Sequence, residues 1–205
     1  MPDVQVERVK PSKHRLRYLS VEEEAQLLSC VDPRREIDGL PSYEQRSPLR
    51  NKLMQDQHDF ILALIETGAR FGEIASLEWS SIDFDRNELR LWRPKVQNES
   101  VLKLSSRLGE MLRRRALTRD VSIKYVFHTK DGRPKAHSSS TMRKIFNRAG
   151  LPDCSYHTLR HTFASQLVQK GVSILEVREF LGHTDIKTTM RYAHLAERFI
   201  GRLGA

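Results

Sequence analysis

HTLRHTFASQLVQK, residues 157–170, has the helical pattern from which the fold class can first be inferred. When its residues are placed at about 100° each, as on a helix, the larger apolar side chains fall on one stripe. That stripe holds Leu159, Phe163 and Leu167. His157, Arg160 and His161 gather on a second face. The stretch therefore predicts a helix that buries one side in a core and presents two imidazoles and a guanidinium on another.

Most of the remaining chain has the same helical periodicity. It predicts helices over residues 20–31, 53–67, 72–79, 106–117, 138–149, 173–181 and 185–196. Two of these start with a capping box, formed by Ser20 with Glu23 and by Ser173 with Glu176. Gly68 and Gly182 follow two of the helix ends, and the proline-rich residues 32–50 predict a long irregular loop.

A small sheet is predicted from alternation. Apolar and polar residues alternate over 88–92 and 100–104, which indicates a β-hairpin with residues 93–99 at its tip. Residues 125–128 predict one further short strand. The expected fold class is therefore mainly α with a small antiparallel β-sheet, that is, α+β.

The length of 205 residues and the hydrophobic content of 39% suit one domain with a real core. We expect a linker or tail over 1–16, one domain from residue 17, and a C-terminal tail from about residue 194. No apolar run approaches the roughly 20 residues that cross a bilayer, so we expect no membrane partner. With two cysteines in all, the chain suits the reducing cytoplasm and excludes a disulfide scaffold.

The positive charge is concentrated in one segment. The chain has a formal charge of +9, and residues 103–148 alone contain thirteen basic and three acidic side chains. Such a segment favours a polyanion, although a helix face kept soluble by Lys and Arg is the alternative. The candidate DNA-binding residues are Lys103, Arg113, Arg114, Arg115, Lys130, Arg133, Lys135, Arg143 and Lys144.

The histidines and the arginine of residues 157–170 admit three interpretations. Histidines four apart can bind zinc, but Thr158 stands where a HExxH site has its glutamate, and Cys154 is the one further ligand nearby. They can also be structural. A phosphate clamp, in which Arg160 binds two oxygens and His157 donates to a third, fits the basic composition best.

Two other residues could act with that clamp. Arg70 stands between Gly68 and Gly72 at a helix end, where Glu73 can fold back and hold its guanidinium; a weak surface pair is the alternative. Tyr192 lies off the apolar stripe of the predicted helix 185–196, which makes it a surface residue. It is either unremarkable or a phenol that attacks a bound phosphate.

Four motifs together resemble the tyrosine recombinases, the integrase class typified by temperate-phage integrases. They are RYLSVEEEAQLL at 17–28, TGARFGEIASLEWSSID at 67–83, HTLRHTFAS at 157–165 and LGHTDIKTTMRYAH at 181–194. The resemblance implies that Arg70, His157, Arg160 and His183 are catalytic and that Tyr192 is the nucleophile. It also implies supporting roles for Glu73 and His161.

The family places a catalytic lysine on a β-hairpin, and here the resemblance is less direct. Lys95 lies at the tip of the predicted hairpin, but Pro94 and Val96 beside it differ from the usual neighbours. Lys103 is the rival. We prefer Lys95 because a residue at the tip can reach into DNA.

The resemblance further implies that Tyr192 cleaves and rejoins double-stranded DNA through a 3′-phosphotyrosyl link, without metal or other cofactor. It implies a homotetramer on synapsed DNA formed from monomers, acting in the cytoplasm of a bacterial or phage-infected cell, at the nucleoid. Because the match starts near Arg17, we expect a catalytic domain without the N-terminal DNA-gripping domain. The alternatives are type IB topoisomerase-like relaxation, a metal-dependent nuclease and a DNA-binding module without catalysis.

Overall fold

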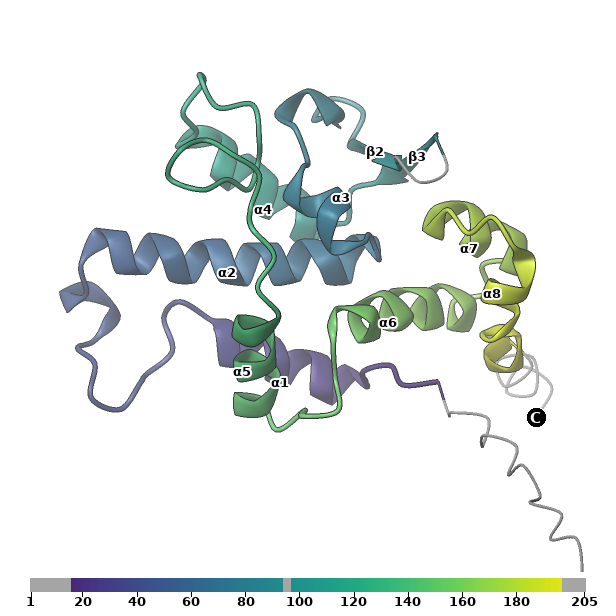
Figure 1. Ribbon diagram of the computed structural model, residues 1–205, viewed down its shortest axis with the longest axis horizontal. Coiled ribbons are helices and arrows are strands. Elements are labelled where there is room, and N and C mark those ends of the chain that lie inside the picture. Colours follow the sequence, from purple (N-terminus) through teal and green to yellow (C-terminus); the bar gives the residue numbers. More distant parts are fainter. Residues whose placement is uncertain (1–15, 94–96, 197–205) are drawn as a thin grey trace, which may run out of the picture.

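The computed structural model describes residues 16–93 and 97–196 (Figure 1). Its first helix, α1 (Val21–Val31), starts at the predicted capping box. The Ser20 hydroxyl accepts a hydrogen bond from the Glu23 N–H at 3.2 Å, and the Glu23 carboxylate accepts one from the Ser20 N–H at 2.9 Å. Helix α5 (Ser139–Arg148) packs against α1.

The long helix α2 (Pro48–Thr67) starts five residues earlier than predicted. Ser47 caps it by accepting a hydrogen bond from the Arg50 N–H, and Pro48 occupies the first turn, where its missing N–H does no harm. The preceding loop is therefore shorter than expected and contains the 3₁₀ turn η1 (Tyr43–Gln45). As predicted, the helix ends at Gly68, which has a φ of 59°.

The sheet has three antiparallel strands in the order β1-β2-β3. β1 (Ile82–Asp83) pairs with β2 (Glu88–Arg93), which pairs with β3 (Asn98–Lys103). Leu89, Leu91 and Arg93 all point inward from β2. The strand predicted at 125–128 is wrong: Tyr125 and His128 form only isolated bridges, with Glu78 and Pro134.

The other helices begin within one residue of their predicted starts, and two of them end well before their predicted last residues. α3 (Phe71–Ala75) is a short helix, followed by the 3₁₀ turn η2 (Trp79–Ser81), and α4 (Ser106–Leu117) follows the sheet. α6 (Tyr156–Gln169) packs beside the end of α2, with α7 (Ile174–Leu181) and α8 (Ile186–Met190) at one end of the molecule (Figure 1). The fold is mainly helical with one small antiparallel sheet, which confirms the predicted class.

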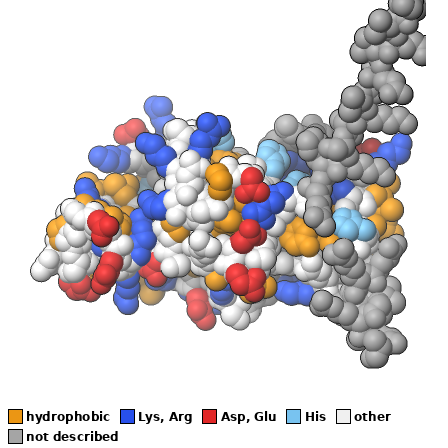
Figure 2. Space-filling model, turned by 90° about the horizontal axis from the view of Figure 1, so that it is seen from below, with side chains coloured by type: hydrophobic (Ala, Val, Ile, Leu, Met, Phe, Trp, Pro, Cys, Tyr) orange, Lys and Arg blue, Asp and Glu red, His pale blue; other side chains and the backbone are white. Residues whose placement is uncertain are grey.

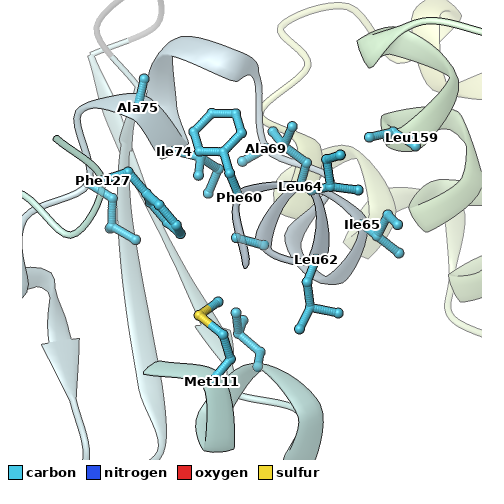
Figure 3. Packing of buried hydrophobic residues seen from close by; sticks show 14 of the residues in the cluster. Phe60, Leu62, Leu64, Ile65, Ala69, Ile74, Ala75, Met111, Phe127 and Leu159 are labelled. Carbon is cyan, nitrogen blue, oxygen red and sulfur yellow. The ribbon is translucent and has the colours of Figure 1, made fainter. Parts of the chain in front are cut away.

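The buried apolar residues form two clusters that meet at α6. The larger one surrounds α2; Figure 3 shows Phe60, Leu64 and Ile65 of that helix between Phe127 on one side and Leu159 on the other. The smaller one joins α6 and α7 to the residues after α8, and it consists of Ala164, Val168, Val177, Leu181, Tyr192 and Leu195. No helix in the described residues is long and apolar enough to cross a membrane.

Candidate active site

Arg160 lies at the junction of three elements. Its side chain projects from α6 into the interior, where Nη1 donates to the Gly68 carbonyl oxygen at 2.7 Å and Nη2 donates to the Leu181 carbonyl oxygen. Burial lowers the pKa of Arg160 to about 10, and the charge of Arg70 acts in the same direction. The guanidinium is still a cation at neutral pH, and it ties the end of α2 to the end of α7.

Arg70 is held by Glu73 in the predicted way. Arg70 is the N-cap of α3, and its Nη1 donates to Glu73 Oε1 at 2.8 Å while its backbone N–H donates to Oε2 at 2.9 Å. The carboxylate is buried, whereas the Arg70 side chain is 36% exposed. The guanidinium is therefore oriented by a fixed partner and still open to a ligand.

His183 follows directly on the glycine that ends α7. Its Nδ1 lies 2.9 Å from the Thr189 hydroxyl of α8. Burial lowers the pKa of His183 to about 4, and the charges of Arg160 and Arg70 contribute to that shift. The imidazole is therefore neutral at pH 7. When Nδ1 accepts from Thr189, the ring proton lies on Nε2, from which it can be donated.

The prediction that Tyr192 lies on the surface is wrong: it is 1% exposed and packs in the smaller cluster. The predicted helix 185–196 is interrupted, because α8 ends at Met190 and residues 191–192 form a turn. Angles on one continuous helix therefore do not apply beyond the turn.

The phenol of Tyr192 is hydrogen-bonded to α6. Its hydroxyl lies 2.6 Å from His161 Nδ1, one residue beyond Arg160. Burial raises the pKa of Tyr192 to about 12, opposed by the charges of Arg160 and Arg191. Burial likewise lowers the pKa of His161 to about 4, so that the phenol faces a neutral imidazole at neutral pH.

The remaining predicted residues differ in placement. His157 is exposed on the first turn of α6, one turn before His161. Lys95 lies outside the described residues. Within residues 16–93 and 97–196, no three His, Cys, Asp or Glu side chains come together as a metal site would require. No motif singles out Arg93, the fully buried last residue of β2, whose Nε lies 3.8 Å from Glu73 Oε1.

A family model described as the phage integrase family matches residues 6–198. The chain belongs to this family. A XerC-like tyrosine recombinase of Caldanaerobacter subterraneus is 33% identical over 175 residues, 66% of this chain and 44% of that protein. The integrase of Salmonella phage P22 is 34% identical over 147 residues, 64% of this chain and 37% of that one.

Solved structures share this fold. The catalytic domain of bacteriophage HP1 integrase matches with a TM-score of 0.61 and 26% identity, covering 91% of this chain and 92% of that one. The Tn1549 transposon integrase in complex with transposon right end DNA shares the fold, with a TM-score of 0.73 at 18% identity, over 99% of this chain and 71% of that one. The chain spans about half the length of the curated relatives it matches.

In this member of the phage integrase family, the basic segment is partly neutralised by acids from other elements. Five of its cations form ion pairs, namely Lys103 with Glu88, Arg107 with Glu24 and Glu66, Arg114 with Asp59, Arg115 with Asp56 and Asp59, and Lys124 with Glu78. On the face seen in Figure 2, Lys and Arg side chains are interspersed with Asp and Glu. A count along the sequence therefore overstates the field of this segment.

Two predicted DNA-binding residues of this chain are poorly placed for DNA. Arg115 is 13% exposed and also donates to the Val126 carbonyl oxygen, so it holds α4 to α2 instead of facing a ligand. Lys135 is half-buried above the Phe60 ring, and burial lowers its pKa. Lys130, Arg133, Arg143 and Lys144 are exposed and have no ion-pair partner in the described part of the chain. Arg113 is exposed and is hydrogen-bonded to the side chain of Asn87.

Proposed function

We propose that this chain is the catalytic part of a site-specific DNA recombinase that cleaves and rejoins DNA through a 3′-phosphotyrosyl intermediate. The observation that carries the proposal is the 2.6 Å contact between the Tyr192 hydroxyl and His161 Nδ1. It brings a phenol from beyond α8 to the helix that carries Arg160 and His157. The family and the motif resemblance support the same reading.

The arginines supply the electrostatic part of the reaction. Attack of the Tyr192 oxygen on phosphorus forms the phosphotyrosyl bond, releases the phenol proton and breaks the bond to the 5′-oxygen. Arg70 and Arg160 neutralise the non-bridging oxygens, where negative charge increases in the transition state. His157 and His183 donate further hydrogen bonds to those oxygens. The bond energy is retained in the ester, so the rejoining step needs only a 5′-hydroxyl from the incoming strand.

The 5′-oxygen needs a proton as it leaves, and Lys95 is the donor we propose. Its rival Lys103 pairs with Glu88 at 2.8 Å and lies opposite that residue in the register. Arg93 and Asn98 form the pair at the other end of the two strands. Five residues at about 3.3 Å each place Lys103 roughly 17 Å along the strand from Asn98. Arg93, at that other end, lies beside Glu73, the carboxylate that holds Arg70. Lys103 is therefore at the end of the strands away from the site, which favours Lys95 as the source of the proton.

The buried phenol means that the described arrangement is a resting one. A phosphodiester cannot reach an oxygen that is enclosed by α6 and α7 and paired with His161. DNA binding must therefore move the residues around Tyr192 so that the phenol is exposed to the phosphate. We propose double-stranded DNA as the partner. Its contact surface would be formed by Lys130, Arg133, Arg143 and Lys144, with Lys103, Arg113 and Arg114 at the edge of that surface. We propose a tetramer of this chain on two synapsed duplexes, assembled from monomers.

The test is covalent trapping on a nicked duplex from which the cleaved end diffuses away. Tyr192→Phe should bind DNA with an unchanged affinity and form no adduct. Tyr156→Phe is the matched control, since it removes another half-buried phenol hydroxyl, from the residue beside His157, and should still form the adduct. Adduct formation by Tyr192→Phe would refute the assignment of the nucleophile.

A further inference from the structure

Arg93 is a cation that is buried away from solvent. It is the last residue of β2, and its side chain is fully buried. Its guanidinium donates to the Ser100 hydroxyl of β3 and to the carbonyl oxygens of Glu179, at 3.3 Å, and Phe180. Its Nε has no hydrogen-bond partner within the described residues. A buried charge of this kind is unfavourable unless neighbouring groups pair with it and accept its hydrogen bonds.

The groups around Arg93 are the ends of elements that carry the active site. Glu73 Oε1 lies 2.8 Å from Arg70 Nη1 and 3.8 Å from Arg93 Nε, so one carboxylate oxygen faces both arginines. On the other side, Glu179 and Phe180 present the last carbonyls of α7, where the helix dipole favours a cation. Arg93 thus connects the companion of Arg70 to the end of α7.

The end of α7 is shared with Arg160. The Leu181 carbonyl oxygen accepts from Arg160 Nη2, and the two carbonyls before it accept from Arg93. Gly182 and His183 come next in the chain. Gly182 has a φ of 60°, and a Cβ added to it would lie 2.4 Å from Arg93 Cδ. The backbone that leads into His183 is therefore packed directly on the Arg93 side chain.

We propose that Arg93 is a positioning residue for the phosphate-binding groups, acting on Arg70 through Glu73 and on Arg160 and His183 through the end of α7. This inference rests on the proposed function, because it places Arg93 as a buried cation behind Arg70 and Arg160, the arginines that would touch the scissile phosphate. Arg93 itself touches no substrate. Its loss should leave DNA binding unchanged and misplace the groups that stabilise the transition state.

The experiment compares Arg93→Met with Arg90→Met. Arg90 is the exposed arginine on the opposite face of the same strand, so its variant controls for loss of one positive charge. Single-turnover cleavage is measured at saturating DNA on a phosphodiester substrate. It is measured again on a substrate whose scissile phosphate is a methylphosphonate, which lacks the negative charge that Arg70 and Arg160 neutralise. Thermal unfolding and DNA affinity are recorded for each variant.

We expect Arg93→Met to cleave the phosphodiester about 10- to 100-fold more slowly than the parent chain, with unchanged affinity. On the methylphosphonate the deficit should shrink to a few-fold. Arg90→Met should match the parent on both substrates. A parental rate for Arg93→Met, or an equal deficit on the two substrates, would overturn the inference, since the latter is what general loosening of the fold produces.

A milder variant keeps the test decisive if Arg93→Met does not fold. Ser100→Ala removes only the hydroxyl partner of Arg93 and should show the same substrate-dependent deficit, reduced in size. Arg70→Ala separates this inference from the proposed function. If Arg70→Ala also cleaves at the parental rate, the proposed function fails; if it is inactive while the Arg93 and Ser100 variants are unaffected, only the role of Arg93 fails.

Discussion

Gly68→Ala should destabilise the protein more than the same substitution at Gly39, which also has a positive φ. Gly68 has a φ of 59°, in the left-handed region, and an added Cβ would lie 2.4 Å from Phe163 Cδ1 and 3.0 Å from Phe163 Cβ. Phe163 lies on α6, three residues after Arg160, and is partly buried against both clusters. The added methyl therefore pushes directly on the helix that carries the site.

The size of the effect follows from two contributions. The left-handed conformation costs a residue with a Cβ about 1–2 kcal/mol. Forcing an extra carbon into packed surroundings typically costs about 1–3 kcal/mol. Together they lower the free energy of unfolding by about 2–5 kcal/mol. For a chain of this length, each kcal/mol shifts the melting temperature by about 2–4 °C.

Gly39→Ala is the matched control. Gly39 has a φ of 74°, and a Cβ there would meet nothing within 4 Å, so it shows the backbone contribution alone. Urea unfolding followed by circular dichroism measures both variants, and their difference should be about 1–3 kcal/mol. When both variants are made again in a Phe163→Ala chain, the difference between their unfolding free energies should mostly disappear. If Gly68→Ala is no less stable than Gly39→Ala, the packing argument is refuted.

Asp59→Asn should lower the unfolding free energy by about 3–5 kcal/mol, because it leaves Arg114 and Arg115 beside a buried neutral amide; the exposed carboxylate variant Asp153→Asn should change it by less than about 1 kcal/mol. Burial lowers the pKa of His161 and of His183 to about 4, below their unfolded value, so stability should be full above about pH 6.5 and fall as the pH decreases toward 4; a flat melting-temperature profile over this interval would contradict this. Replacing both Arg143 and Lys144 with Gln should reduce the salt slope of DNA binding by about two, whereas Arg115→Gln should reduce stability and leave the slope unchanged.

The helical frame could be predicted because its signals are local. Ser20, Ser173 and Gly182 each mark a helix end through contacts within a few residues, and all three do so in the structure. The start of α2 was missed because Ser47 and Pro48 lie in a stretch whose prolines and charges resemble a loop. Tyr192 was misplaced because a turn breaks the helix on which its angle depends, and nothing local to residues 185–196 marks that turn.

The charges could not be placed from the sequence, because their partners are distant in it. Arg115 pairs with residues on α2 more than fifty positions away, and its neighbour Arg113 remains exposed. Arg93 did leave a signal. It continues the inward alternation of Leu89 and Leu91 by one more step, so period two predicts a buried arginine if the strand is extended to residue 93.

The acceptors at the end of α7 are main-chain oxygens of Glu179, Phe180 and Leu181. Replacing these side chains removes none of the oxygens, so this part of the site tolerates sequence drift at the exposed Glu179, whereas Leu181 is also held by its place in the smaller cluster. The vulnerable quantity is the position at which the helix stops. An insertion or deletion of one residue within α7 would rotate the last carbonyls by about 100° around its axis and present neither arginine with its acceptors.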